Sequence, residues 1–354
     1  MYNYIIYFNQ MINILIYKDI QKRHLLKANI INTINMAQGF AQNDCNVSFY
    51  VRESIMYFFE NKFVNSNITM VNNIDFKNIN QYDIIYCRDE TYPLQLVTNK
   101  SYSGIIIIES HDINLSPDDI LTLQEYDKLV FTSISPLIIN KYNFNTSLLF
   151  PCSIDFDTFS NMDAYKTDMF LSDKFNITYC GHLYDYKGIP IIIEAAKILT
   201  DCIFHIIGGN NEDINRHKQV SPENMIYYGH KKYNEVPNYL YSSDLLLIPY
   251  NKTGNKFSPS NITSPIKLFE YLSVRKPVLC SDIIGIKNWV DSSDVYFYTA
   301  NELNDFIEKI TYIRETKNSE EYRQKISSGY TKAKYYSTQN KCNKLLCLAK
   351  SLMF

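Results

Sequence analysis

The chain of 354 residues is too long for one ordinary hydrophobic core and long enough for two domains of roughly 150 residues each. Its formal net charge of −2, with no dominant block of Lys or Arg, gives no support for a nucleic-acid-binding protein. Hydrophobic residues make up 46% and charged residues 20% of the chain, as in globular proteins, and no apolar run reaches the roughly 18 residues of a membrane-spanning helix.

Eight cysteines are spread along the chain without a Cys-x-x-Cys pair, so the spacing supports neither a zinc site nor a disulfide framework. They are typical of buried thiols in a reducing compartment. The opening segment MYNYIIYFNQ is apolar but lacks the basic leader of a secretory signal peptide. We therefore expect a cytoplasmic protein, with peripheral contact to the inner face of the membrane left open.

The first half of the chain alternates predicted strands and helices. The apolar run 12–17 predicts a buried parallel strand, a helical pattern covers 25–42, and 47–51 returns to strand character. Further strands are predicted at 82–90, 104–112, 128–132 and 147–150, with a short helix at 133–140. The order is typical of a Rossmann-like sheet, but no G-x-G-x-x-G follows the first strand, so a dinucleotide site in this half is unsupported.

Charged side chains follow two of these predicted strands. They are Arg88, Asp89, Glu109, His111 and Asp112. Because functional groups in open α/β sheets gather beyond the carboxyl ends of the strands, these residues are candidates to line a cleft. The alternative is that they only cap strands and helices.

Residues 151–173 are polar and rich in turn-forming types, which suits a connection between domains. We expect an N-terminal domain over 1–170, a C-terminal domain over 171–335 and a final helix over 336–354. Packing of that helix back on the N-terminal domain is one arrangement that the pattern allows.

A second series of strands and helices follows this connection. Strands are predicted at 177–181, 204–209, 225–230, 244–250 and 295–298, and helices at 189–199, 235–242, 301–316 and 341–353. Asn234 is the predicted cap of the helix at 235–242. Gly208, Gly209 and Gly229 stand at strand exits, where glycine lets a ligand approach the backbone closely. Both halves are therefore expected to be parallel α/β sheets.

The segment 264–282 predicts a helix that leads into a buried strand. Ser264 is the expected N-cap and Pro265 the first helical residue. The free amides of Ile266 and Lys267 would then form an anion site, and phosphate is a common occupant of such sites. Glu270 lies one turn further on, where it could accept hydrogen bonds from sugar hydroxyl groups. The alternative is an ordinary capped amphipathic helix.

Lys187 adds a positive charge in the loop after the first strand of the second half. Lysine, a glycine-rich backbone and a helix N-terminus together can hold a diphosphate without a metal. Each feature alone has a plain explanation, such as a solvated lysine or a tight turn. Their joint occurrence in this order is what favours a nucleotide site.

The second half resembles the C-terminal domain of glycosyltransferase family 4, the retaining GT-B enzymes, over residues 176 to about 340. The segments that carry this resemblance are YCGHLYDYKGIPIIIEAAKIL, FHIIGG, YYGHKKYNEVPNYLYSSDLLLIPY and SPIKLFEYLSVRKPVLCSD. The first half resembles the family more loosely, through IIIIESHD and FPCSIDFDTF.

The resemblance implies an α/β protein of the GT-B fold, with two Rossmann-like domains facing across a central cleft. It implies a nucleotide-sugar donor bound mainly by the C-terminal domain and a glycan, polysaccharide or lipid-linked acceptor bound mainly by the N-terminal domain. It also implies transfer with retention of anomeric configuration, in polysaccharide, glycan or glycolipid assembly, without a cofactor or a required metal.

Roles carry over only to positions that match the family's motifs. Lys187 matches the diphosphate lysine, Glu270 the second glutamate of Glu-x7-Glu, which usually holds the ribose, and His111 the histidine near the transferred sugar. These three are the expected catalytic residues. The expected donor-binding residues are His182, Lys187, Gly208, Gly209, Gly229, Ser264, Pro265, Ile266, Lys267, Leu268 and Glu270.

Three positions depart from the family's pattern. Ile262 replaces the first glutamate, and His182 replaces an arginine that partners the diphosphate lysine in many members. The positive charge available to hold the diphosphate is then smaller, unless His182 is protonated or Lys267 compensates. Arg275 stands at the usual helix-ending glycine, where a left-handed conformation would cost about 1 kcal/mol.

Two alternatives to an active transferase stay open. One is another GT-B enzyme such as a nucleotide-sugar 2-epimerase, which would need further acid and base residues. The other is a catalytically weak, transferase-like protein that binds a nucleotide sugar or a partner, a reading that Ile262 and His182 motivate. The sequence names neither the sugar, the base nor the acceptor.

Overall fold

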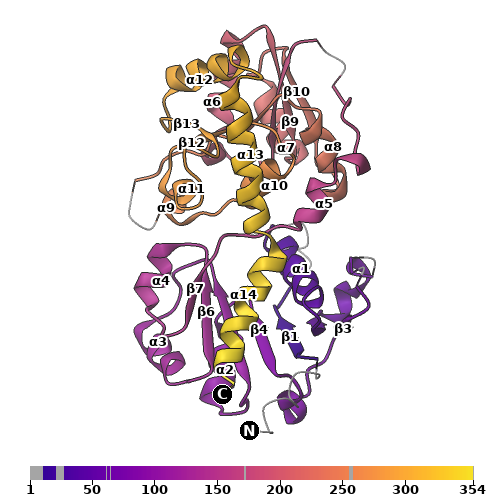
Figure 1. The fold of residues 1–354 in the computed structure, drawn as a ribbon, viewed down its shortest axis with the longest axis vertical. Helices are drawn as coiled ribbons and strands as arrows, with labels where there is room; N and C mark the ends of the chain where they lie inside the picture. Colours follow the sequence, from indigo (N-terminus) through magenta and orange to yellow (C-terminus); the bar gives the residue numbers. More distant parts are fainter. Residues whose placement is uncertain are drawn as a thin grey trace. The chain divides into compact units, whose positions relative to one another are not determined.

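The chain divides into two compact units, each built around its own sheet (Figure 1). The computed structural model describes residues 11–20, 28–60, 62–63, 65–170, 173–254 and 258–353. Unit 1 comprises Met1–Asp155 and Tyr336–Phe354, and unit 2 comprises Phe156–Tyr335. The final helix therefore belongs to the unit that contains the N-terminal half of the chain.

The division falls within the turn-rich connection, before residue 170. Immediately after it, helix α5 (Phe156–Ser160) packs within unit 2. The buried Phe159 ring lies 5.2 Å from the ring of Tyr233, and the Tyr241 hydroxyl donates a hydrogen bond of 2.7 Å to the Phe159 carbonyl oxygen. The second half of the predicted connection is thus structured and attached to unit 2.

The described part of unit 1 contains a parallel sheet of seven strands in the order β3-β2-β1-β4-β5-β6-β7. The strands are β1 (Asn13–Tyr17), β2 (Asn46–Tyr50), β3 (Ile68–Val71), β4 (Ile84–Cys87), β5 (Ile105–Ser110), β6 (Leu129–Ser133) and β7 (Ser147–Leu149). Strand β1 lies between β2 and β4, with Ile14 opposite Val47 of β2 and Ile84 of β4.

Helices cover both faces of this sheet, and short 3₁₀ turns complete the connections. These elements are α1 (Ala28–Ala41), η3 (Glu53–Phe58), η4 (Phe76–Gln81), α2 (Thr91–Thr98), α3 (Pro117–Gln124), α4 (Pro136–Tyr142) and α14 (Thr338–Ser351). Ile14 and Ile16 pack with α1 and α14, whereas Leu15 packs on the opposite side with α2, α3 and α4. This alternation explains the continuous apolar run, because a strand buried on both faces needs apolar residues at every position.

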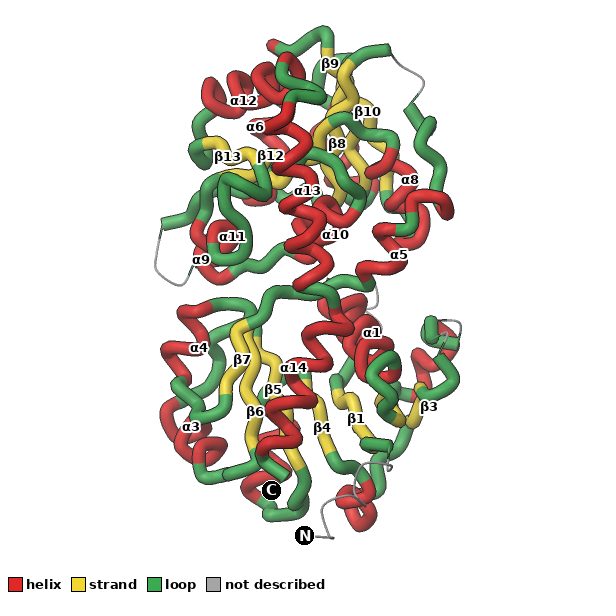
Figure 2. The backbone as a smooth tube through the Cα atoms, in the orientation of Figure 1, coloured by secondary structure: helices red, strands yellow, loops and turns green. Residues whose placement is uncertain are grey.

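The described part of unit 2 contains a six-stranded parallel sheet in the order β10-β9-β8-β11-β12-β13, drawn in yellow in Figure 2. The strands are β8 (Phe175–Cys180), β9 (Cys202–Ile207), β10 (Met225–Gly229), β11 (Leu245–Ile248), β12 (Val278–Ser281) and β13 (Tyr296–Tyr298). Their order places β8 between β9 and β11. The exits of the first three strands therefore lie next to one another.

Helices and turns of unit 2 connect these strands. They are η5 (Met162–Ala164), η6 (Asp185–Lys187), α6 (Ile189–Ile198), α7 (Asn211–Lys218), η7 (Tyr233–Glu235), α8 (Val236–Tyr241), α9 (Pro259–Ile262), α10 (Ile266–Ser273), α11 (Ile284–Lys287), α12 (Leu303–Glu315) and α13 (Glu320–Tyr335). One core combines α6, α12 and one face of the sheet, with Ile192, Phe306 and Leu247 all buried.

The two α/β sheets confirm the predicted Rossmann-like halves. The differences are elements that were not predicted, such as β3 and α7, and two helix starts. Helix α10 begins at Ile266 with Pro265 at the N-cap, so Ser264 is one position too early. Asn234 lies inside the turn η7 and does not cap the following helix, which begins at Val236. Helix α1 is described from Ala28 onward, and residues 25–27, where the helix was expected to begin, lie outside the described residues.

Neither disulfide bonds nor a membrane-spanning helix is found in the part of the chain that the structure describes. All eight cysteines are free thiols, as the spacing predicted. Within the described ranges, no helix combines the length and the apolar character that would be needed to cross a membrane.

Candidate functional site: a glycine edge and two lysines in unit 2

Three neighbouring strands of unit 2 lead into glycines, which form an edge without side chains. The Gly181 amide donates to Ile207 O and the Gly208 amide donates to Gly229 O, each at 2.8 Å. Gly208 has a φ of 110°, and a Cβ there would lie 2.2 Å from the Gly181 carbonyl oxygen. A side chain is therefore excluded at this point, where two strand exits pack backbone against backbone. We call Gly181, Gly208, Gly209 and Gly229 the glycine edge.

Lys267 reaches this glycine edge from the first turn of α10. A Cβ on Gly181 would lie 2.3 Å from the Lys267 Nζ atom, so ammonium and bare backbone are in contact. The same Nζ atom lies 4.3 Å from the centre of the Tyr179 ring. Burial lowers the pKa of Lys267 to about 8. The site thus presents a partly desolvated cation whose charge an anion would stabilise.

Lys187 supplies a second cation near the first. Its Nζ atom lies 3.7 Å from the centre of the Tyr250 ring, and the Lys267 Nζ atom lies 5.5 Å from the same centre. Burial and the neighbouring charge of Lys267 lower the pKa of Lys187 to about 7. Two lysines that disfavour each other's charge form a site in which a bound anion would relieve the repulsion.

Local geometry places Lys187 at the end of the short turn η6. Gly188 follows with a φ of 84°, and a Cβ there would lie 1.8 Å from the Pro249 carbonyl oxygen. The Asn251 amide donates a hydrogen bond of 3.0 Å to Tyr186 O. Glycine is required at this close approach, and the loop that carries Lys187 is held against the exit of β11.

Helix α10 is tied to β8 and carries a buried carboxyl group. The Cys180 amide donates to the Tyr271 hydroxyl oxygen at 2.8 Å, and the Tyr233 hydroxyl donates to Glu270 Oε1 at 2.8 Å. Burial raises the pKa of Glu270 to about 7. The first-turn amides of a helix have no intrahelical partner, so the start of α10 could offer donors and a positive dipole end to an anion.

His182 does not provide a positive charge at neutral pH. Burial and the charges of Lys267 and Lys187 lower its pKa, and its ring stacks on that of Tyr184 at a centroid distance of 5.2 Å. Of the two expected compensations for the absent arginine, the geometry favours Lys267. Ile262 lies at the end of α9 and brings no carboxylate.

A polar cavity in unit 1

A polar cavity of about 350 Å³ lies in unit 1 at the exits of the paired strands β4 and β5. The structure brings together here all five charged residues that the sequence placed at strand ends. The cavity is lined by Lys18, Arg88, Asp89, Glu90, Glu109, Ser110, His111, Asp112 and Asn114. Basic, acidic and uncharged polar side chains thus line the same cavity.

Glu109 is fully buried beneath this cavity and accepts four hydrogen bonds. Its Oε1 atom accepts from His111 Nε2 at 2.7 Å and from Asn32 Nδ2 at 3.1 Å. Its Oε2 atom accepts from the Tyr86 hydroxyl at 2.6 Å and from Lys341 Nζ at 2.7 Å. Burial alone would raise the pKa of Glu109, but Lys341, the His111 hydrogen bond and Arg88 hold it well below the usual value.

His111 has both ring nitrogens engaged. Nε2 faces Glu109 and Nδ1 lies 2.7 Å from Arg88 Nη2. Since a guanidinium can only donate, Nδ1 is the acceptor and Nε2 carries the hydrogen. Burial and the Arg88 charge lower the pKa of His111 to about 3. The imidazole is therefore neutral.

Several residues of these two sites were missed by sequence reasoning. Tyr233, Tyr250 and Tyr179 resemble any other tyrosine in this tyrosine-rich chain, and no pattern singles them out. Lys341 did carry a signal. It lies four residues before Leu345 and therefore on the apolar stripe of the last helix, where a lysine needs a buried partner.

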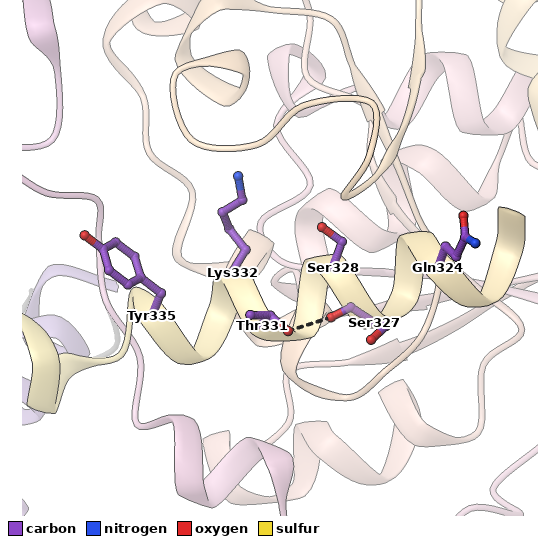
Figure 3. Close-up of a pocket in the computed structure, with 6 residues that line it drawn as sticks. All are labelled: Gln324, Ser327, Ser328, Thr331, Lys332 and Tyr335. Atoms are coloured by element: carbon purple, nitrogen blue, oxygen red, sulfur yellow. Dashed lines mark hydrogen bonds between the residues drawn. The ribbon is translucent and has the colours of Figure 1, made fainter.

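Another hollow, in unit 2, lies open along α13 (Figure 3). It is lined by Gln324, Ser327, Ser328, Thr331, Lys332 and Tyr335. Asp294 accepts a hydrogen bond of 2.6 Å from the Ser328 hydroxyl and lies 2.9 Å from Lys332 Nζ. Because the cation already has an acidic partner, we assign no ligand to this surface.

Comparison with known proteins finds similarity over the segment that contains the glycine edge. Residues 174–315 match the model of the family described as Glycosyl transferases group 1. A putative teichuronic acid biosynthesis glycosyltransferase, TuaH of Bacillus subtilis, is 31% identical over 108 residues, 30% of this chain and 26% of the relative. An uncharacterised 41.2 kDa protein in the cps region of Klebsiella pneumoniae is 30% identical over 79 residues, 22% of each chain. The matches thus span about a quarter of each curated relative.

Solved structures match nearly the whole chain. A glycosyltransferase from Rickettsia africae has a TM-score of 0.75 at 12% identity, with 98% of this chain and 99% of that chain covered. Anabaena HepE in complex with UDP has a TM-score of 0.70 at 12% identity, with 97% and 100% covered. The fold is therefore the GT-B fold of glycosyltransferases, as the sequence resemblance implied.

Proposed function

We propose that the chain is a glycosyltransferase that moves a sugar from a nucleoside-diphosphate sugar to a glycan, polysaccharide or lipid-linked acceptor. The observation that carries the proposal is the pair Lys187 and Lys267 beside the glycine edge at the start of α10. The family match over residues 174–315 supports it, because the match contains this whole arrangement.

In this proposal the donor diphosphate lies against the glycine edge. Lys187, Lys267 and the first-turn amides of α10 neutralise its charge, which grows as the bond to the sugar breaks. Ser264, Pro265 and Leu268 frame the same helix start, and Glu270 accepts hydrogen bonds from the ribose. His182 contributes shape and stacking to the donor site without a charge.

We propose retention of anomeric configuration on the family 4 resemblance, with the acceptor bound by unit 1. His111 is the proposed group near the transferred sugar. Because both ring nitrogens are engaged, its contribution is a fixed polar surface, and proton transfer by its imidazole is disfavoured. The two lysines would replace the charge of a metal ion, so we expect transfer to continue in the presence of EDTA.

A thermal-shift screen of the full chain against UDP-, GDP-, ADP- and CMP-sugars tests the proposal. A ligand that binds only the folded state stabilises it by mass action, by about 2.7 kcal/mol at one hundred times its Kd. We expect one nucleoside-diphosphate sugar to raise the Tm and the CMP-sugars, which carry one phosphate, to have little effect. No shift with any of these diphosphate sugars would count against the assignment.

The second candidate function is that of a binding protein without turnover, which the carboxylate missing at Ile262 favours. Binding of a donor together with no transfer to any of a panel of glycan and lipid-linked acceptors, and no release of nucleotide, would support it. A 2-epimerase would instead release an epimerised sugar from the donor without an acceptor.

A further inference from the structure

Tyr250 follows β11 directly and lies next to both lysines of the candidate donor site. Its ring centre is 3.7 Å from the Lys187 Nζ atom and 5.5 Å from the Lys267 Nζ atom. The residue is only 5% exposed, so the ring meets these cations away from bulk water. The face of an aromatic ring attracts a cation at such distances, and the attraction is strongest where both groups are desolvated.

The backbone fixes Tyr250 against the turn η6. On one side of Tyr250, the Pro249 carbonyl oxygen is so close to Gly188 that a Cβ there would lie 1.8 Å from it. On the other side, the Asn251 amide donates a hydrogen bond of 3.0 Å to the Tyr186 carbonyl oxygen. The ring is therefore held beside the end of η6, where the first of the two lysines lies.

Tyr250 is the aromatic residue that the two ammonium groups share. Lys267 Nζ also lies 4.3 Å from the centre of the Tyr179 ring, and Lys187 Nζ lies 5.1 Å from that of Tyr186. Tyr186 is 46% exposed, so its contact is the more hydrated one. The contact with Tyr250 is therefore the closest and best shielded ring contact of Lys187.

This contact opposes the effects that neutralise the two lysines. Burial lowers the pKa of both, and the charge of Lys267 lowers the pKa of Lys187 further. The ring acts in the opposite direction, because its negative face attracts the ammonium form and not the neutral amine. A lysine that is already charged and ordered also binds an anion at a smaller entropic cost.

We propose that Tyr250 is a positioning residue that keeps the ammonium groups of Lys187 and Lys267 charged and in place for the diphosphate of the donor. A ring covers only one side of an ammonium group, so other N–H donors remain available to phosphate oxygens. The identity of the ligand rests on the proposed function. The effect of the ring on the lysines does not, since it can be measured in the free protein.

Other titratable groups near the two lysines stay in place when only the ring of Tyr250 is changed. They are Tyr179 and Cys180 at the end of β8, His182 and Tyr186 in the loop that follows, and Glu270 on α10. A change in the electron density of the ring therefore alters one interaction in a constant setting.

Fluorinated phenylalanines at position 250 provide this change with almost no change in shape. Fluorine withdraws electrons from the face of the ring and so weakens its attraction for a cation. The series in the full chain comprises wild type, Tyr250→Phe, and phenylalanine analogues with one, two and three fluorine atoms at this position. The same analogues at Phe306, whose ring lies 4.7 Å from that of Tyr298 in the core of unit 2, are the matched control.

Inorganic pyrophosphate is the probe for binding, because it carries the diphosphate charge without a base or a sugar. We expect Tyr250→Phe to bind it like the wild type and each further fluorine atom to weaken binding, by roughly 3- to 30-fold for three fluorine atoms. The number of protons taken up on binding at pH 7.5 should rise along the series. Calorimetry in buffers of different ionisation enthalpy measures both quantities, and the Phe306 series should change neither.

Lysine NMR measures the effect of the ring without a ligand. The ¹³Cε signals of Lys187 and Lys267 are assigned by their loss in Lys187→Arg and Lys267→Arg and are followed from pH 6 to 11. With the trifluorinated ring we expect both lysines to titrate at lower pH than in Tyr250→Phe, and the shift to be larger for Lys187, which lies closer to the ring. Lys350, an exposed lysine on α14, should titrate alike in both proteins.

Two results would overturn the proposal. One is a pyrophosphate affinity that stays constant or rises along the series, and the other is a Lys187 that titrates at the same pH with and without fluorine. If the trifluorinated ring prevents folding, the monofluorinated ring decides with the same signs. If the wild type binds neither pyrophosphate nor any nucleoside diphosphate, the proposed donor site fails, while the lysine titration still decides whether the ring stabilises the two charges.

Discussion

Two lysines with lowered pKa values define the chemistry of unit 2 at the residue scale. Lys187 and Lys267 are mutually repelling cations with pKa values of about 7 and 8, and the Lys267 ammonium lies against the glycine edge. An arriving diphosphate would restore their full charge. Binding of the donor should therefore take up protons.

We predict that the affinity for the nucleoside diphosphate falls between pH 7 and 9, by roughly tenfold per pH unit for each proton taken up. The sign follows because the free lysines lose protons over this range while the bound ones keep them. Calorimetric titrations in buffers of different ionisation enthalpy measure the proton uptake directly. An affinity and a proton count that do not change across this range would contradict the prediction.

Replacement of Glu270 should have opposite effects on the stability of the fold and on the affinity for the nucleoside diphosphate. Its pKa is raised to about 7, so the folded protein binds a proton more tightly than the unfolded chain and loses stability as pH rises from about 4.5 to about 7. Glu270→Gln removes this loss and should have an equal or higher Tm at pH 8. The same variant should bind the nucleoside diphosphate roughly tenfold more weakly, because a charge-assisted hydrogen bond to the ribose is gone. Unchanged affinity would exclude Glu270 from the ribose site.

At the element scale, α10 ends as the sequence predicted. Arg275 adopts a left-handed conformation with a φ of 55°, directly after the last turn of the helix. Its guanidinium carbon lies 3.5 Å from the centre of the Tyr330 ring. The attraction between the cation and the ring offsets the backbone strain, which explains why arginine is tolerated where glycine is usual.

Substitutions at this position should separate strain from stacking. Arg275→Ala keeps the strain and loses the ring contact, so we expect a loss of about 1 kcal/mol in the free energy of unfolding. Arg275→Gly also loses the contact but removes the strain, and should be the more stable of the two variants. Urea unfolding of both variants measures the difference, and an alanine variant more stable than the glycine variant would contradict this account.

The elements that the sequence predicted best are those whose burial leaves a clear local pattern of apolar residues. A strand buried on both faces needs a continuous apolar run, as in β1 and β5. The helix α10 starts one residue later than predicted: Ser264 was the expected cap and Pro265 the first helical residue, whereas Pro265 is the cap in the structure. Strand β3 was missed because its half-buried sequence, ITMV, has no such run.

At the scale of the whole molecule, sequence reasoning found the two sheets and the charged groups at their strand ends. It could not find pairings between distant segments, such as Lys341 with Glu109 or Tyr233 with Glu270, because nothing local specifies them. The predicted donor-site residues lie in motifs, where a turn, a helix start or a strand exit constrains the residue type.

The central claim is that Lys187 and Lys267 hold the diphosphate of a sugar donor. The most direct test measures release of nucleoside diphosphate from the donor found by the screen, for wild type, Lys187→Ala, Lys267→Ala and Lys350→Met as the matched control. We predict that wild type and the control turn over, and that each site variant binds the nucleoside diphosphate roughly 10- to 100-fold more weakly and releases it more slowly. Full activity in both site variants would contradict the account.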